Sequence, residues 1–165
     1  MRDNRDIELA MKQHANTVLR VCTLYFKNQA NREDAFQDTF LKYAQSNTTF
    51  ESEEHRKAWL IRVATNTCKD MLKAASMGNV GFDECTEESF IDTRSQEEAD
   101  KNLQAEELAA ALRKIDEKYA QVLYLKYYEG YTAPEIAELL DIPENTVYTN
   151  ISRGKEKLKE VLTHD

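Results

Sequence analysis

Residues 132–147 read TAPEIAELLDIPENTV, and this stretch decides the fold of the segments around it. Its first four residues have the pattern of a capping box, with a threonine cap, a proline in the first turn and a glutamate that reaches back to the cap. The sequence Asp-Ile-Pro at residues 141–143 then interrupts the helical pattern. The stretch therefore predicts a short helix over residues 133–140, a tight turn, and a last helix over residues 144–162.

The last helix would have an apolar side and a polar side. Apolar or small residues at positions 147, 151, 154, 158 and 161 would pack against the preceding helices. The polar side would expose five candidate DNA-binding side chains: Tyr148, Thr149, Ser152, Arg153 and Lys155. A second helix of this kind fits the major groove, where polar side chains reach base edges. The alternative is a helical hairpin that serves packing alone.

Helical patterns also precede this motif. Residues 103–115 and 117–129 each read as a helix, and Gly130 suits the position that closes the second one. Towards the N-terminus, apolar residues from position 7 to 25 recur every three or four residues, which predicts one helical face. Residues 28–32 break that pattern.

Two more helices are expected in the N-terminal half, over residues 33–45 and 56–73, with a polar loop over residues 46–54 between them. In the first of these, Phe36, Phe40, Leu41 and Ala44 are expected to face inward. The whole chain thus reads as all-α. Glycine and proline together make up about 4% of it, against an average usage of roughly 12%, so a β-sandwich or barrel lacks the turn residues it needs.

Charge divides the chain into three parts. Residues 1–75 carry a net charge of +2, residues 76–101 of −6 and residues 102–165 of −4, for a total of −8. The middle part has no sustained period and reads as an acidic, flexible linker between an N-terminal and a C-terminal helical domain. Because phosphate neutralisation supplies most non-specific affinity for DNA, the C-terminal domain is expected to bind DNA weakly by itself.

Several classes of protein are disfavoured by the sequence. No stretch approaches the ~18 apolar residues of a membrane span, and no apolar signal-peptide core follows the polar N-terminus, so a cytoplasmic protein without membrane insertion is expected. Three widely spaced cysteines favour reduced thiols, with Cys22 and Cys68 in the core. No catalytic motif or metal-ligand spacing occurs, so no enzyme activity, catalytic residue, metal or cofactor is expected.

The helix expected over residues 56–73 is unusually basic. Residues 55–73 hold five lysines or arginines and one acid. The chain's one tryptophan and an asparagine lie among them, and the candidate DNA-binding residues are Trp59, Arg62, Asn66, Lys69 and Lys73. Cations, an aromatic ring and an amide can together hold a strand backbone, stack on a base and read its edge. An ordinary solvated helix with a core tryptophan is the alternative.

Asp34, Gln37 and Asp38 are spaced to lie on one face of the helix before it. Such a face suits contact with a basic partner helix. A solvated face without a partner is the alternative.

These motifs resemble those of the extracytoplasmic-function (ECF) class of bacterial RNA polymerase sigma factors, in the sigma-70 family. Residues 33–42, EDAFQDTFLK, resemble the family's core-binding segment, and residues 58–66, AWLIRVATN, resemble the part that melts and reads the −10 element. Residues 122–132 and 135–147 resemble the promoter-reading C-terminal domain. The two motif sets occur in order and cover roughly 130 of the 165 residues.

The resemblance implies a role for each candidate site. Asp34, Gln37 and Asp38 would contact the β′ clamp helices of core polymerase, and the C-terminal domain the β flap. The basic helix would contact the non-template strand around the −10 element, while the loop over residues 46–55 would receive a flipped base. The last helix would read the −35 element. An anti-sigma factor is a further expected partner.

The sequence departs from the family's pattern in three places: Tyr148 and Asn150 stand where a basic residue is common, Asp141 replaces a turn glycine, and residues 115–116 replace a Leu-Pro. The first departure leaves open which residues read the −35 bases. Two other functions remain as hypotheses: a stand-alone helix–turn–helix transcriptional regulator, and an adaptor that binds protein only.

Overall fold

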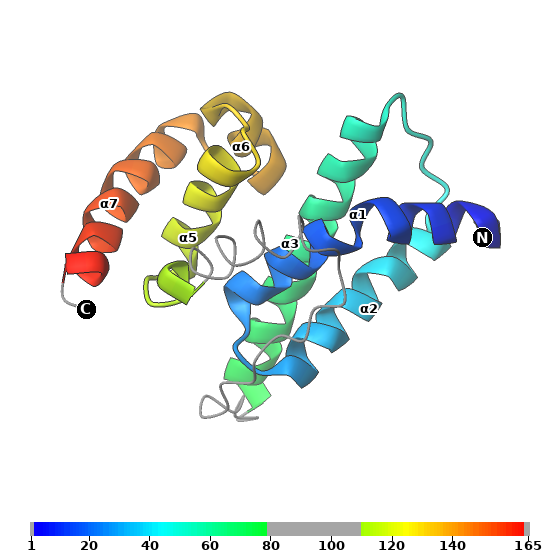
Figure 1. Ribbon diagram of the computed structural model, residues 1–165, viewed down its shortest axis with the longest axis horizontal. Coiled ribbons are helices and arrows are strands. Elements are labelled where there is room, and N and C mark those ends of the chain that lie inside the picture. Colours follow the sequence, from blue (N-terminus) through cyan, green and yellow to red (C-terminus); the bar gives the residue numbers. More distant parts are fainter. Residues whose placement is uncertain (1, 79–109, 164–165) are drawn as a thin grey trace, which may run out of the picture. The chain divides into compact units, whose positions relative to one another are not determined.

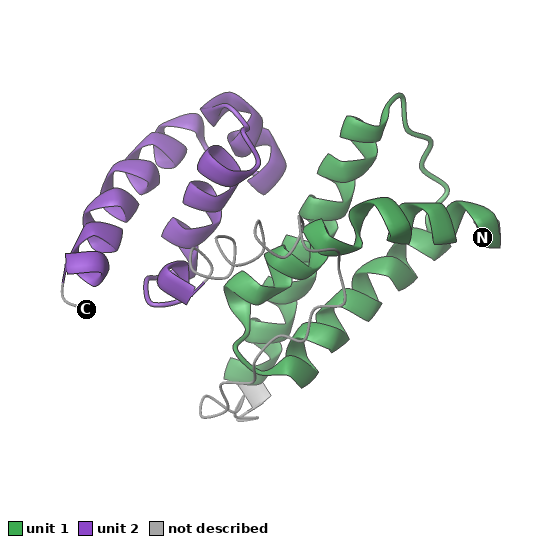
Figure 2. Cartoon of the chain, in the orientation of Figure 1, with its two compact units in different colours: residues 1–87 green, residues 88–165 purple. Residues whose placement is uncertain are grey.

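The computed structural model describes residues 2–78 and 110–163 (Figure 1). The chain divides into two compact units, residues 1–87 and 88–165 (Figure 2). All regular elements in the described ranges are helical, as predicted. No helix in these ranges is long and apolar enough to span a membrane. Most of the expected acidic linker, residues 79–101, and most of the helix expected over residues 103–115 lie outside the described residues.

The first unit consists of three helices that pack against one another: α1 (Asn4–Tyr25), α2 (Gln29–Gln45) and α3 (Glu53–Gly78). Its core is formed by aliphatic, aromatic and small side chains from all three helices. The fully buried residues include Val18, Cys22, Ala35, Tyr43, Leu60, Ile61 and Cys68. Both cysteines are thus small core residues with free thiols, as the sequence predicted.

Helix α2 starts four residues earlier than predicted. Residues 28–32 are polar and were interpreted as a break, but Asn28 caps the helix, and its side chain accepts a hydrogen bond of 2.7 Å from the Ala30 amide. Arg32 is buried although charged, and its Nε donates to the Phe26 carbonyl at 2.7 Å. The polar run therefore begins the helix instead of interrupting it.

The second unit contains α5 (Glu117–Leu123), a π-helical turn η1 (Tyr124–Tyr128), α6 (Ala133–Leu140) and α7 (Glu144–Thr163). Helix α7 packs on both α5 and α6. The predicted helix over residues 117–129 is therefore α-helical only in its first half. The Glu129 amide bonds to the Tyr124 carbonyl at 3.2 Å, five residues back, which widens the helix by one residue in this turn.

The predicted helix–turn–helix motif is confirmed, and its first helix, α6, has the expected features at both ends. Thr132 and Glu135 form the capping box, with the Thr132 amide donating to Glu135 Oε1 at 2.8 Å. Asp141 ends α6 in the left-handed conformation, with φ of 55°. Aspartate tolerates this conformation better than most residues, so it replaces a turn glycine without changing the motif. Gly130, with φ of 83°, closes the preceding helix as expected.

Candidate functional site

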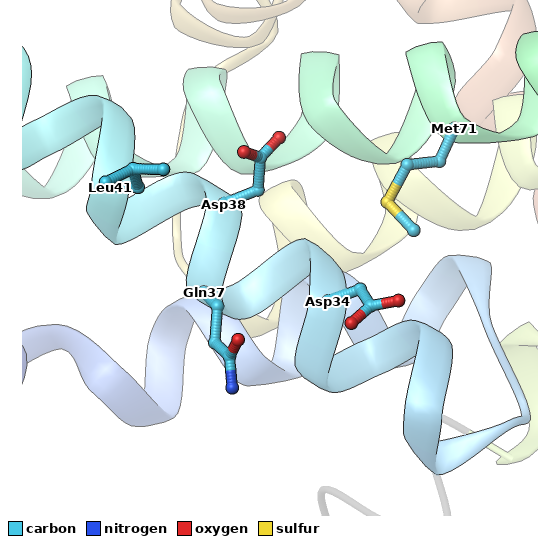
Figure 3. A pocket seen from close by; sticks show the side chains of 5 residues that line it. All are labelled: Asp34, Gln37, Asp38, Leu41 and Met71. Atoms are coloured by element: carbon cyan, nitrogen blue, oxygen red, sulfur yellow. The ribbon is translucent and has the colours of Figure 1, made fainter.

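An acidic hollow lies on α2 of the first unit. Asp34, Gln37 and Asp38 line an open pocket of about 540 Å³ together with Leu41 and with Met71 from α3 (Figure 3). The structure thus brings the three predicted polymerase-binding residues together on one surface. Carboxylates and an amide beside two apolar side chains suit a partner helix that carries both basic and apolar residues.

Leu41 corrects a prediction. It was expected to face the core, yet 51% of it is exposed on the rim of this hollow. Residue 41 follows Asp34 by seven positions and Asp38 by three, so two helical turns place it on the same face as the carboxylates. That spacing was the available signal, but the apolar character of leucine was interpreted as a sign of burial.

Lys42 orients the carboxylate of Asp38. Its Nζ lies 3.5 Å from Asp38 Oδ2, one helical turn back, and donates to Thr67 Oγ1 of α3 at 2.9 Å. The bond to a buried threonine fixes the ammonium group between the two helices. Lys42 therefore places a positive charge beside Asp38, on the edge of the hollow.

The basic face of α3 contains the predicted DNA-binding residues of the first unit. Arg62, Asn66 and Lys73 are exposed and Lys69 is half-buried. Their spacing of four, three and four residues places them along one stripe of the helix. This stripe carries three cations and one amide, which suits a strand backbone with an exposed base.

Trp59 lies at the start of that stripe but is half-buried in an aromatic cluster. Its ring meets the rings of Tyr43 and Phe50 edge-on, at 5.8 Å between centroids in each case. Phe50 belongs to the loop between α2 and α3 and stacks on Tyr43 at 6.1 Å. Trp59 therefore braces this loop, and its contact with DNA stays a prediction.

A polar network surrounds the cluster and shifts two carboxyl pKa values. The hydrogen bond from Tyr43 Oη to Asp6 Oδ1, 2.7 Å long, lowers the pKa of Asp6, and the guanidinium groups of Arg2 and Arg56 act in the same direction. Burial and the bond to Asp6 raise the pKa of Tyr43. The pKa of Glu53, which begins α3, is lowered mainly by its 2.9 Å bond to His14.

In the second unit, α7 exposes all five predicted DNA-binding residues. Thr149, Ser152, Arg153 and Lys155 are exposed, as is 54% of Tyr148. Asn150, at a position that is often basic in the family, is only 9% exposed and packs inside the unit. Its buried side chain is poorly placed for a phosphate contact, whereas Tyr148 is exposed and its hydroxyl donates to Glu144 Oε1 at 3.5 Å.

Tyr127 is a surface residue that sequence reasoning missed. It is 55% exposed on η1, and the Nζ of Lys155 lies 5.2 Å from its ring centroid. Lys126 also approaches the ring, at 5.9 Å. The π-helical turn that exposes this tyrosine has no recognisable pattern in the sequence, so the exposure of Tyr127 could not be predicted.

The described residues contain no cluster of side chains that could bind a metal ion. Across residues 2–78 and 110–163, no three His, Cys, Asp or Glu side chains come together as metal ligands would.

Comparison with known families decides between the remaining hypotheses. The sequence model of sigma-70 region 2 matches residues 10–77, and that of sigma-70 region 4 matches residues 105–158. The first match covers most of the three-helix unit and the second the helix–turn–helix unit. This chain belongs to the sigma-70 family. Both regions are present in one chain, and neither comparison favours a stand-alone regulator.

Curated relatives place the sigma factor in the ECF class. It is 28% identical over 158 residues to the ECF RNA polymerase sigma factor SigW of Bacillus subtilis, which covers 90% of this chain and 84% of SigW. It is 25% identical over 167 residues to the ECF RNA polymerase sigma-E factor of Haemophilus influenzae, covering 95% and 87%. Promoter-specific initiation of transcription with RNA polymerase is accordingly the function of this sigma factor.

Solved structures share its fold. The sigma factor RpoE of Bartonella quintana, solved in complex with the anti-sigma factor NepR, superposes with a TM-score of 0.72 at 18% identity, over 98% of this chain and 99% of that one. CnrH, in complex with the cytosolic domain of CnrY, gives a TM-score of 0.66 at 21% identity, over 99% and 91%.

Proposed function

We propose that this sigma factor divides promoter recognition among three surfaces, each carried by one helix. The acidic hollow on α2 binds the β′ clamp helices of core polymerase. The basic stripe of α3 and the adjoining loop hold the opened −10 element, and the polar face of α7 reads the −35 element. The observation that supports this proposal best is that both sigma-70 regions match in order, each on a unit that exposes the expected side chains.

The chemistry of each surface suits its proposed ligand. Asp34 and Asp38 are carboxylates beside an apolar rim, which a basic and apolar helix would complement. On α3, cations and Asn66 face outward where an unpaired strand could lie. The polar residues in the first half of α7 match the part of a recognition helix that meets base edges.

The free sigma factor is expected to bind DNA weakly, which agrees with the proposal that its three surfaces act together on polymerase. The chain has a net charge of −8, so a search of DNA by the free protein would gain little from phosphate neutralisation. Bound to polymerase, the two units act at a high effective concentration on the same promoter. The β flap of core polymerase is the proposed partner of the second unit.

The proposal includes no covalent chemistry by the sigma factor itself, and no cofactor. Because core polymerase is a cytoplasmic enzyme in bacteria, the proposal also places the chain in the cytoplasm. Two solved neighbours are named as complexes with a protein partner, one of them an anti-sigma factor. We extend this to an anti-sigma factor as a partner of this chain.

One reconstitution experiment tests the three surfaces separately. The double variant Asp34→Ala, Gln37→Ala should lose co-purification with core polymerase while its helical circular dichroism is unchanged. Asn66→Ala should reduce open-complex formation more than closed-complex binding. Arg153→Ala should weaken holoenzyme binding by ~1–3 kcal/mol at promoters with the preferred −35 sequence.

Each surface has its own contradicting result. Undiminished core binding by the double variant would remove the hollow from the proposal. Equal losses in open and closed complexes would make Asn66 a general DNA contact. A loss by Arg153→Ala that is uniform over all promoters would make Arg153 a phosphate contact.

A further inference from the structure

The loop between α2 and α3, residues 46–52, is fastened by a residue from the other end of the unit. Arg2 precedes α1, and its backbone amide donates to the Ala44 carbonyl at 2.9 Å. Its Nε donates to the Tyr43 carbonyl at 2.9 Å, and Nη2 bonds to Ser46 Oγ at 3.4 Å and to the Thr48 carbonyl. Arg2 therefore bonds to two carbonyl groups at the end of α2, of which that of Tyr43 also accepts from the Ser46 amide, and its contacts continue into the loop.

The same guanidinium group flanks the aromatic cluster. Its Cζ lies 4.2 Å from the ring centroid of Tyr43 and 5.1 Å from that of Phe50. Arg56 approaches Phe50 as well, at 5.0 Å. Phe50 is the loop's apolar anchor, and two cations and the rings of Tyr43, His55 and Trp59 surround it.

Asp6 allows the two guanidinium groups to lie near the same ring. Its Oδ2 lies 3.2 Å from Arg2 Nη1 and its Oδ1 lies 3.2 Å from Arg56 Nη1. Without this carboxylate, two like charges would face each other around Phe50 and Tyr43. The network therefore connects the start of α1, the end of α2, the loop and the start of α3.

A loop that is already ordered should bind a flipped base more tightly and more selectively than a flexible loop. A flexible loop must lose conformational freedom when it closes around a base, and that loss reduces affinity and discrimination. A loop that is already held in shape needs no such ordering, and geometric precision in the surrounding residues sets how well it separates similar ligands. Arg2 supplies several of the restraints that hold residues 46–48 and Phe50.

We propose that Arg2 is a positioning residue for promoter recognition, which holds the 46–52 loop in the shape that captures a −10 base. This inference rests on the proposed function of that loop. Arg2 acts through the loop carbonyls and Phe50 and need not touch DNA. Its planar fork is essential to the role, because one side chain must bond to several acceptors in different directions.

The first test measures base preference. Holoenzymes with the wild-type chain, Arg2→Ala, Arg2→Lys or Arg5→Ala are titrated with non-template-strand oligonucleotides substituted at each −10 position. Arg2→Ala should reduce the preference for the captured base by about tenfold, with core binding and −35 preference unchanged. Arg5→Ala is the matched control and should behave as wild type, because Arg5 is an exposed arginine three residues further on, in the first turn of α1.

Arg2→Lys separates positioning from charge. Lysine keeps the positive charge but lacks the fork, so positioning predicts a loss close to that of Arg2→Ala. Full preference in the lysine variant, or in Arg2→Ala, would overturn the inference. Asp6→Asn provides a second variant with a smaller perturbation, and it should also reduce base preference.

The second test needs neither polymerase nor DNA. Trp59 is the only tryptophan in the chain and touches Phe50, so its quenching by acrylamide reports how firmly the loop is held. Quenching should rise in Arg2→Ala and stay at the wild-type level in Arg5→Ala. Unchanged quenching would contradict the anchoring by Arg2. Absence of any −10 base preference in the wild-type holoenzyme would instead contradict the proposed function of the loop.

Discussion

Leu41 shows at the scale of one residue how an apolar side chain can belong to a binding surface. It lies on the rim of the acidic hollow, where it is 51% exposed. A leucine in this position gains free energy only when a partner covers it. The proposed contact with core polymerase would cover this side chain beside Asp38.

We predict that Leu41→Ala weakens binding to core polymerase by about 1–3 kcal/mol, the range expected when a leucine becomes buried in an interface. The dissociation constant of the sigma factor from core polymerase measures this effect. Leu9→Ala is the matched control, because Leu9 is also 51% exposed but lies on α1, away from the hollow. Equal effects of the two substitutions would contradict a specific role for Leu41.

The carboxyl groups of Asp6 and Glu53 lead to a second prediction for single residues, which concerns how the stability of the first unit depends on pH. Both have pKa values lowered in the folded chain, Asp6 mainly by Tyr43 and Glu53 mainly by His14. A carboxyl of this kind stabilises the fold above its ordinary pKa of about 4, and the stabilisation is lost as pH falls through the lowered value. The first unit should therefore lose stability in acid.

Urea unfolding followed by Trp59 fluorescence measures this loss, because the chain's one tryptophan lies in the first unit. Asp6→Asn should be less stable than wild type at pH 7, and the difference should shrink as pH falls below about 4. A difference of the same size at both pH values would show that the charge of Asp6 contributes nothing.

At the scale of helices and turns, sequence signals predicted best where the cause is local. The capping box at Thr132 and the left-handed turn at Asp141 depend on residues within a few positions of each other, and both are confirmed. The start of α2 was missed because Arg32 is buried by a bond to the Phe26 carbonyl, six residues away. The amino-acid composition of the π-helical turn, residues 124–128, does not distinguish it from an α-helix.

Among the surface residues, too, those placed by local helical spacing could be predicted and those placed by long-range contacts could not. The faces of α3 and α7 could be predicted from helical spacing, and the structure exposes nearly all the side chains expected on them. The contacts of Arg2 with the loop could not be predicted, because Tyr43 and Ser46 lie more than forty positions along the chain. Contacts of that separation follow only from tertiary packing.

Gly154 marks the close crossing of α7 with α5. A Cβ atom at this position would lie 3.0 Å from Leu123 Cδ1 and 3.1 Å from Tyr119 Cβ. The leucine side chain can rotate, but the Cβ of Tyr119 is attached to the backbone and cannot yield without moving α5. An alanine at this position would therefore require α5 and α7 to separate by a few tenths of an ångström.

We predict that Gly154→Ala destabilises the second unit. Overpacking costs typically 1–3 kcal/mol, which exceeds the roughly 1 kcal/mol that alanine gains over glycine in a helix. Amide hydrogen exchange should become faster in α5 and α7, with Glu156→Ala on the exposed side of α7 as the control. Unchanged or slower exchange in Gly154→Ala would mean that the crossing relaxes freely.

At the scale of the whole molecule, a chain of net charge −8 carries two units that expose basic or polar faces. Neither unit offers the dense positive charge of a protein that binds DNA tightly alone. Two weak contacts become selective when both are presented by one polymerase, because the second contact is then effectively intramolecular. Specificity in this account belongs to the holoenzyme.

The most direct measurement of this claim is transcription by purified sigma factor and bacterial core RNA polymerase from a library of templates with randomised upstream sequence, followed by sequencing of the transcripts' 5′ ends. The account predicts that active templates share two short sequence blocks at a fixed spacing, and that Asn66→Ala relaxes only the block nearer the start site and Arg153→Ala only the farther one. Initiation without a shared sequence, or with a single block that both substitutions affect alike, would contradict it.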